Sequence, residues 1–379
     1  MLPILMNGDA PSVETERRGC LRCEVLPAPP DGAGDLHCWF PAPHVANKAR
    51  AMFRDLGLAP RPTAGDGIAC AIPAADQARV EAAFREQLSK LECEDTRALL
   101  TGVDAPLVPD DLARVESLAR LLARRGSRWL VAMLEESRFT SHFQPIMHAA
   151  APETVYGHEA LLRGMTVSGE VVPPREMFDV ARDAGMLFQL DLAARRSAII
   201  AAQQHELRGA LFVNFAPTAI YDPASCLRST VAAVDQAGIQ RSDVFFEIVE
   251  TERAHDSGHL RRILEYYRNA GFRVALDDVG SGYSSLNLIH ELRPDLLKLD
   301  MELIRGVDTD SYKARLVENL LNVAAVLNID TLAEGIETEG ELRWVQAHGA
   351  SYVQGFLLGR PAPKPLPVTP VASPEPHAA

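Results

Sequence analysis

The stretch FRVALDDVG, residues 272–280, is a short apolar run that ends in two adjacent carboxylates and a glycine. A second run, LLKLD at 296–300, follows closely and carries a lysine inside an otherwise apolar segment. Apolar runs that end in polar groups are typical of the buried parallel strands of a β/α barrel, whose strand ends meet at one mouth. This pair of runs therefore predicts two neighbouring barrel strands.

The same pattern recurs along the whole second half of the chain, with successive polar groups 20 to 55 residues apart. That spacing matches a strand plus a return helix, so the groups are expected to gather at one mouth. They are Glu159 in HEALL, Asn214 in LFVNF, Glu247 in FFEIVE, Asp277 and Asp278 in VALDDVG, Lys298 in LLKLD, Glu334 in TLAEG and Gln354 in YVQGF. Gathered carboxylates repel one another unless cations lie among them. Mg²⁺ and Mn²⁺ are the expected ions because they prefer oxygen ligands.

The fold class predicted from these runs is α/β, an irregular (β/α)8 TIM-like barrel. Its eight expected strands are 142–147, 155–162, 210–215, 243–249, 272–278, 296–300, 330–335 and 351–356. Only residues 148–154 join the first two strands, which is too short for a crossover helix. We therefore expect one antiparallel strand in the barrel.

The remaining sequence divides into segments of different composition. Residues 19–95 alternate strand-like and helical runs, which predicts a small α+β domain of the ferredoxin-like kind. Asp110 and Asp111 are expected to cap a helix within 112–126. The full division is a flexible N-terminus at 1–18, the small domain at 19–95, linker helices at 96–137, the barrel at 138–362 and a disordered proline-rich tail at 363–379.

Bulk composition narrows the class of protein. The 379 residues are 47% hydrophobic and 23% charged, as in ordinary globular proteins. A net charge of −13 argues against a general nucleic-acid surface but permits an anionic ligand beside bound cations. No apolar run reaches the roughly 20 residues of a membrane span, and the start lacks the pattern of a secretory signal. Cytoplasmic location is the expectation.

Four residues near the N-terminus form a possible zinc pattern: Cys20, Cys23, His37 and Cys38. Adjacent residues on a strand point to opposite faces, so His37 and Cys38 are poorly placed to share an ion. Buried free thiols are the favoured interpretation, and zinc at Cys20 and Cys23 the less favoured one.

Taken together, the motifs from HEALL to YVQGF resemble the EAL-domain family, phosphodiesterases that open the bacterial second messenger cyclic di-GMP. The resemblance covers residues 138–362 and not the N-terminal region. It implies signal transduction by hydrolysis of cyclic di-GMP to linear pGpG with two Mg²⁺ or Mn²⁺ ions, and a homodimer formed through the barrel. An N-terminal regulatory domain with a protein partner of its own is a further expectation.

The resemblance also implies roles for single residues. Glu159, Asn214, Glu247 and Asp277 would ligate one metal, and Asp277 would bridge to a second metal near Asp278 and Glu334. The implied catalytic residues are Glu159, Lys298 beside the attacking water, and Glu334 as proton acceptor. The implied substrate contacts are Gln144, Leu161, Arg163, Asp191 and Gln354, with Glu250 supporting the loop after Asp278. Val279 stands where the family usually has phenylalanine.

Each of these residues taken alone is more often an ordinary cap, solvated carboxylate or satisfied amide. The prediction of a catalytic site depends on all of these residues occurring together and in the family's order. Two other functions stay open: a receptor that binds cyclic di-GMP without hydrolysing it, and a β/α-barrel hydrolase that acts on another phosphodiester.

Overall fold

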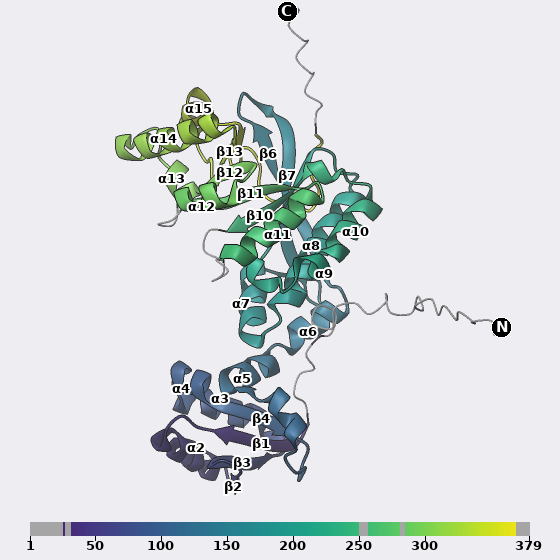
Figure 1. Ribbon diagram of the computed structural model, residues 1–379, viewed down its shortest axis with the longest axis vertical. Helices are drawn as coiled ribbons and strands as arrows, with labels where there is room; N and C mark the ends of the chain where they lie inside the picture. Colours follow the sequence, from purple (N-terminus) through teal and green to yellow (C-terminus); the bar gives the residue numbers. More distant parts are fainter. Residues whose placement is uncertain (1–25, 27–31, 250–256, 281–284, 369–379) are drawn as a thin grey trace, which may run out of the picture.

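The computed structural model describes residue 26 and residues 32–249, 257–280 and 285–368. It consists of a small N-terminal domain and a larger β/α barrel, which meet at α5 (Leu118–Gly126) and α6 (Arg128–Glu135) (Figure 1). Expectations for residues 1–18, Cys20, Cys23, Glu250 and the tail beyond 368 fall outside the described residues. In the part of the chain that is described, no helix combines the length and apolar character needed to span a bilayer.

The small domain is an antiparallel sheet with helices packed on one face. Its strands lie in the order β2-β3-β1-β4-β5, and the first four have the βαββαβ order of a ferredoxin-like fold. Leu36, Cys38 and Ile68 face Phe53 and Phe84 of the helices in one buried core. The elements are β1 (Gly34–Trp39), α2 (Pro43–Asp55), β2 (Arg61–Thr63), β3 (Gly67–Ile72), α3 (Gln77–Gln87), α4 (Lys90–Asp95), β4 (Arg97–Thr101) and β5 (Glu116–Ser117).

The boundary at residue 95 differs from the expectation, because the small domain's sheet continues past it. β4 pairs with β1, and β5 pairs with β4, so residues 97–101 and 116–117 of the expected linker belong to this sheet, whereas α5 and α6 are helical as expected. Residues 109–114 form a 3-10 turn, and the α-helix begins only at Leu118, with Ser117 rather than Asp110 or Asp111 as its N-cap. Pairing of Glu116 and Ser117 with β4 holds that backbone extended and delays the helix.

Neighbouring His37 and Cys38 point to opposite faces of β1, as strand geometry predicts. Cys38 is fully buried in the helix-facing core. The His37 ring contacts Thr63 Oγ1 at 3.1 Å through Nδ1 and Thr101 Oγ1 at 3.2 Å through Nε2. His37 and Cys38 therefore lie on opposite sides of the sheet and contact different groups.

The barrel contains the eight expected strands and one short extra strand. The sheet order is β6-β14-β13-β12-β11-β10-β9-β7-β8, and pairing of β6 with β7 closes the ring. β6 runs antiparallel to both of its neighbours, which confirms the expected irregularity. The strands are β6 (Phe139–His148), β7 (Ala151–Met165), β8 (Val171–Val172), β9 (Ala210–Asn214), β10 (Val244–Val249), β11 (Arg273–Val279), β12 (Leu296–Leu299), β13 (Asp330–Ala333) and β14 (Tyr352–Val353).

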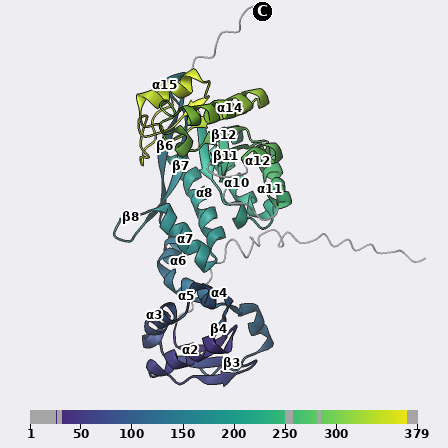
Figure 2. The same cartoon turned by 90° about the vertical axis from the view of Figure 1, so that its left-hand side faces the viewer.

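Helices cover the outside of the barrel (Figures 1 and 2). Residues 174–204 form two helices because Gly185 takes a left-handed φ of 71° between them, a conformation that favours glycine. The helices are α7 (Pro174–Ala184), α8 (Leu187–Gln204), α9 (Pro223–Cys226), α10 (Arg228–Ala237), α11 (Ser257–Asn269), α12 (Ser285–Leu292), α13 (Met301–Ile304), α14 (Ser311–Leu327) and α15 (Glu339–Ala347).

Two apolar layers hold the barrel together. Inside the ring, Phe212 and Phe245 stack with centroids 4.3 Å apart, beside Ala275, Leu296 and Leu332. Outside the ring, the alternate strand residues pack against the helices in a larger core. Because both faces of each strand are buried, the strands read as continuous apolar runs. The polar residues at the strand ends are the exceptions to this pattern.

Candidate active site at the barrel mouth

Lys298 lies at the centre of a cluster of carboxylates at the carboxyl ends of the strands. Its Nζ is 2.7 Å from Glu247 Oε1, 2.8 Å from Glu334 Oε1 and 3.0 Å from Asp277 Oδ1, with Glu159 Oε1 at 3.9 Å. The lysine side chain is only 2% exposed. Residues from β7, β10, β11, β12 and the end of β13 thus converge on one buried ammonium.

Amide side chains hold Glu159 in place. Asn214 Nδ2 donates to Glu159 Oε1 at 3.1 Å, and Gln354 Nε2 donates to Glu159 Oε2 at 3.0 Å. The strand register brings these groups together, since Asn214 lies opposite Glu247 and Gln144 lies opposite Glu159. Every predicted strand-end residue from β6 to β14 therefore lies in one constellation.

The adjacent pair Asp277 and Asp278 is shaped by an irregularity in β11. The pairing of β11 with β12 shifts between Leu276 and Val279, and Asp278 takes a left-handed φ of 55°. This conformation is strained for a residue with a Cβ and is found at functional sites. It brings oxygen atoms of Asp277, Asp278 and Glu334 within 4.8 Å of one another.

Burial and mutual repulsion raise the acid pKa values in this cluster. Burial raises the pKa of Glu334 to about 8, against an opposing effect of Lys298. Burial, followed by the charge of Asp277, raises the pKa of Asp278 to about 6. The pKa of Glu247 is also raised by its burial. Burial alone would lower the pKa of Lys298, but the surrounding carboxylates raise it well above the ordinary value, so the lysine is a cation.

The donor set fits divalent metal ions. Four carboxylates contact the Lys298 ammonium, and Asp278 lies beside two of them, so the negative groups outnumber the one cation in a buried space. The fully buried Glu247 carboxylate has one ionic contact, Lys298, and no well-oriented hydrogen-bond donor within the described part of the chain. Buried carboxylates of this kind are normally paired or coordinate metals. Oxygen-rich sets suit Mg²⁺ or Mn²⁺.

The cluster forms the floor of a cavity of about 440 Å³ at the barrel mouth. Gln144, Leu161 and Gln354 line it, as expected. Further lining residues were not predicted: Asp300, Met301, Arg305, Glu337 and Phe356. Asp300, Phe356 and Glu337 lie one to four residues beyond the observed ends of β12, β14 and β13, Met301 begins the short α13 and Arg305 follows it, and no sequence signal marks them as facing the mouth. Phe356 is 47% exposed, which is unusual for a large apolar ring.

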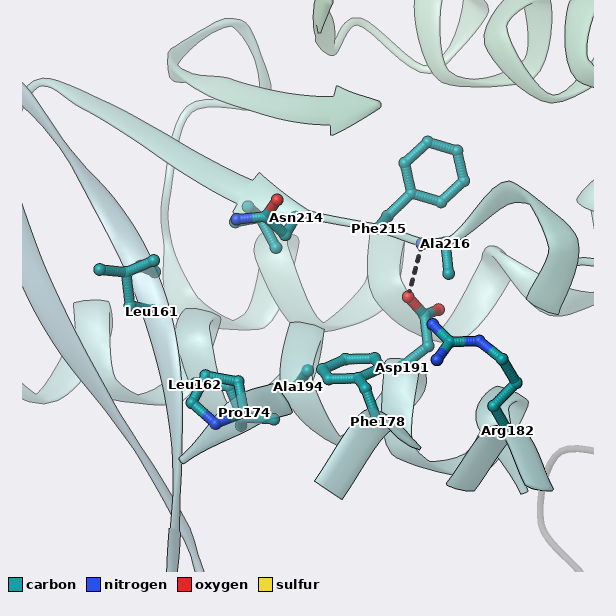
Figure 3. Close-up of a pocket in the computed structure, with 12 residues that line it drawn as sticks. Leu161, Leu162, Pro174, Phe178, Arg182, Asp191, Ala194, Asn214, Phe215 and Ala216 are labelled. Carbon is teal, nitrogen blue, oxygen red and sulfur yellow. Dashed lines mark hydrogen bonds between the residues drawn. The ribbon is translucent and has the colours of Figure 1, made fainter. Parts of the chain in front are cut away.

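A second, more apolar cavity of about 210 Å³ adjoins the first, and Leu161 lines both. Pro174, Phe178 and Arg182, spaced four residues apart on α7, form one wall, and the loop after β9 forms another (Figure 3). This α7 wall was not predicted from the sequence. Its four-residue spacing marks one helix face, but spacing cannot show what that face meets.

Asp191 lies beside this second cavity with both carboxylate oxygens engaged. Oδ1 accepts a hydrogen bond from the Ala216 amide at 2.8 Å (Figure 3), and Oδ2 accepts from Arg195 Nη2 at 2.7 Å. Arg195 is fully buried and also donates to Thr230. The network ties α8 to the loop that follows Asn214, and so fixes the shape of the cavity.

Arg163 is placed differently from the other predicted contacts. It is half-buried and lines neither cavity, and its Nη1 donates to the neighbouring Leu162 carbonyl at 2.7 Å. In the described part of the chain, Arg163 forms no ion pair with a carboxylate of the cluster. Val279 is fully buried, and Gly280 takes a φ of 105°.

Comparison with known proteins gives a consistent result. The family model described as EAL domain matches residues 127–361. The chain is 28% identical over 234 residues to a protein of Pseudomonas aeruginosa named cyclic di-GMP phosphodiesterase NbdA, a match that covers 61% of this chain and 30% of that protein. Three such curated relatives are much longer, and the chain spans 29% to 30% of their lengths.

Solved structures agree with the fold. A standalone EAL protein of Vibrio cholerae O395 in its c-di-GMP-bound form is 36% identical, with a TM-score of 0.54 over 59% of this chain and 92% of that one. The manganese and cyclic di-GMP complex of Klebsiella pneumoniae BlrP1 is 24% identical, with a TM-score of 0.54 over 87% of this chain and 96% of that one. The second match extends beyond the barrel, so the likeness of fold includes residues of the small domain.

Proposed function

Because the EAL-domain family model matches residues 127–361, this chain belongs to that family, and we propose that it hydrolyses cyclic di-GMP to linear pGpG in a metal-dependent reaction. The observation that carries the proposal is the convergence of four carboxylates on Lys298 at the barrel mouth, with Asp278 beside two of them. Relatives named as cyclic di-GMP phosphodiesterases and a relative solved with c-di-GMP bound support the same substrate.

The carboxylates provide two overlapping ligand sets for metal ions. Glu159, Asn214, Glu247 and Asp277 would hold one ion, and Asp277, Asp278 and Glu334 a second. When bound, a pair of divalent ions makes water nucleophilic near neutral pH and neutralises charge on the phosphate oxygens. The strained backbone at Asp278 supports this assignment, because it turns the second carboxylate toward the same space as the first.

Lys298 and Glu334 supply the protein's own acid–base and charge chemistry. Lys298 carries a positive charge that its Nζ can direct at the attacking water and at the charge that develops on the phosphate. Glu334 Oε1 lies 2.8 Å from Lys298 Nζ, so its carboxylate faces the same space as the ammonium. Its carboxylate would accept the proton that the water loses.

The two adjoining cavities match the two chemical parts of the substrate. The acidic cavity holds the reacting phosphodiester, and the apolar cavity beside it holds a guanine base between Phe178, Leu161 and the loop after Asn214. Asp191 Oδ1 accepts a single backbone N–H, and a carboxylate oxygen can accept a second hydrogen bond from a base edge. Arg163 would have to leave the Leu162 carbonyl to reach a phosphate.

We also propose that the protein forms a homodimer through the barrel. The outer face of α14 carries apolar side chains in solvent, with Tyr312 77% and Val326 81% exposed beside Leu316 and Leu327. Apolar stripes of this length on a helix commonly mark protein interfaces. Light scattering should give a dimer mass for the wild type and a monomer mass for Val326→Glu. A monomeric wild type would refute the proposal.

The test of the activity is direct. Purified protein is incubated with cyclic di-GMP and Mn²⁺, and the nucleotides are separated by chromatography. The expected product is pGpG, absent when EDTA is added. Bound but unconverted cyclic di-GMP would favour the receptor function. Turnover of a different phosphodiester alone would favour a β/α-barrel hydrolase with another substrate.

A further inference from the structure

A cleft of about 880 Å³ lies between the small domain and the barrel. Residues of α3, α4, β4, β5 and α5 form one side, and the end of α7 forms the other. Figure 2 shows α5 stacked between the small domain and the barrel helices, and α5 packs against α7. Clefts at domain boundaries are preferred places for small ligands.

The lining of this cleft is basic in a chain of net charge −13. Its cationic side chains are Arg85, Lys90, Arg97, Arg120 and Arg182. Two of its three carboxylates already have cationic neighbours, because Glu116 pairs with Arg124 at 2.9 Å and Glu94 lies 3.8 Å from Lys90. The positive charge in the cleft therefore exceeds the negative charge available to it.

Two of these arginines, Arg97 and Arg120, are placed to bind an anion. Within the described ranges, neither the Arg97 nor the Arg120 side chain has a hydrogen-bond or ion-pair partner. Both are exposed and line the same cleft. Two like charges near one space are unfavourable unless an anion joins them, and guanidinium groups bind phosphate oxygens in a bidentate manner.

The far wall of the cleft belongs to α7, the helix that also lines the apolar cavity of the barrel. Arg182 lines both cavities, and Phe178 and Pro174 stand on the same face of α7 (Figure 3). At the end of this helix, a Cβ on Gly185 would come within 3.2 Å of Arg120 Nε. A ligand that moves Arg120 or Arg182 therefore acts on α7, the helix that forms one wall of the apolar cavity.

We propose that the interdomain cleft binds a small phosphate-bearing anion through Arg97 and Arg120. We further infer that an anion bound in the cleft changes, through α7, the affinity of the apolar cavity for cyclic di-GMP, a step that rests on the proposed function. The small domain is then the regulatory part of the protein, and α7 is the element shared by the two sites.

Binding is tested with inorganic pyrophosphate and the full chain, by calorimetry in metal-free buffer containing EDTA. The wild type should bind, and Arg97→Ala and Arg120→Ala should each weaken binding about tenfold, since each removes charge-assisted hydrogen bonds. Arg208→Ala is the matched control, because Arg208 is exposed and has no side-chain partner among the described residues. It should bind like the wild type.

Exposed arginines without partners are substituted at little cost in stability, so the variants should fold, and thermal unfolding checks this. Absence of pyrophosphate binding by the wild type would overturn the proposal. Equal affinity in Arg97→Ala, Arg120→Ala and Arg208→Ala would do so as well, because it would place the anion elsewhere.

The link to the barrel is tested by titrating cyclic di-GMP with and without saturating pyrophosphate, again without metal. The wild type should show a change in cyclic di-GMP affinity of at least fivefold, within the usual range of coupling between sites. Arg120→Ala should show none. An unchanged affinity in the wild type would refute the role of α7. Loss of cyclic di-GMP binding altogether would instead count against the proposed function, while the pyrophosphate titration would still decide the cleft.

Discussion

Replacing Lys298 by methionine tests how the active site balances its charges. The substitution keeps a similar unbranched side chain but removes the one cation that contacts Glu247, Glu334 and Asp277 within 3.0 Å. Because Lys298 does not belong to the proposed metal ligand set, the variant should keep its metal sites. It should lose the charge that faces the attacking water.

Two magnitudes follow from this geometry. Removing one charged donor aimed at developing negative charge lowers kcat by roughly 100- to 1,000-fold, with a small change in KM. In EDTA, leaving buried carboxylates without their counter-ion should lower the free energy of unfolding by about 3 kcal/mol. Saturating Mn²⁺ should recover most of that loss, because bound ions would take over the neutralisation of the same carboxylates.

The assay is steady-state conversion of cyclic di-GMP to pGpG at saturating Mn²⁺, with urea unfolding measured in EDTA and in Mn²⁺. Lys364→Ala serves as control, since Lys364 is an exposed lysine that lines neither cavity of the barrel. An increase in KM alone would mean that Lys298 only clamps phosphate. Equal stability of variant and wild type in EDTA would refute the charge-balance reasoning.

Three further predictions address other parts of the molecule. Glu159→Ala should abolish most metal-dependent turnover, because it removes a ligand held by Asn214 and Gln354; near wild-type rates would show that Glu159 is not a ligand. Phe178→Ala should raise KM about tenfold and leave kcat nearly unchanged, since a base contact in the apolar cavity is lost, and kinetics that show the reverse would contradict a base site there. Burial lowers the pKa of His37, so His37 takes up a proton at a higher pH in the unfolded chain than in the folded one. The free energy of unfolding should therefore fall as the pH drops below about 6.5. Urea unfolding at pH 7.5 and 5.5 should show a smaller loss for His37→Gln, and an identical loss would contradict this assignment.

Much of the barrel and its site could be predicted because their signals are local. Each strand is buried on both faces, so a polar residue at its end stands out against an apolar run, as Asn214 and Lys298 do. The order of the motifs then indicated both the family and the groups that meet at the mouth. The short connection at 148–154 was enough to predict the antiparallel pairing of β6 and β7, which the structure confirms.

Other features had no local signal. The segment 109–117 was expected to start a helix, yet pairing of Glu116 and Ser117 with β4 keeps its end extended. Phe356 and Met301 were passed over because nothing in their own sequence shows that they face the mouth.

The amino-acid sequence by itself determined the barrel, the strand ends and the residue types that gather there, because alternation of apolar runs and polar ends is written along the chain. Only the tertiary structure decided that α7 stands between the base cavity and the small domain, and that Arg97 and Arg120 face one cleft. These neighbours come from separate elements, and their contact depends on how two domains pack. Periodicity within either element carries no information about that packing.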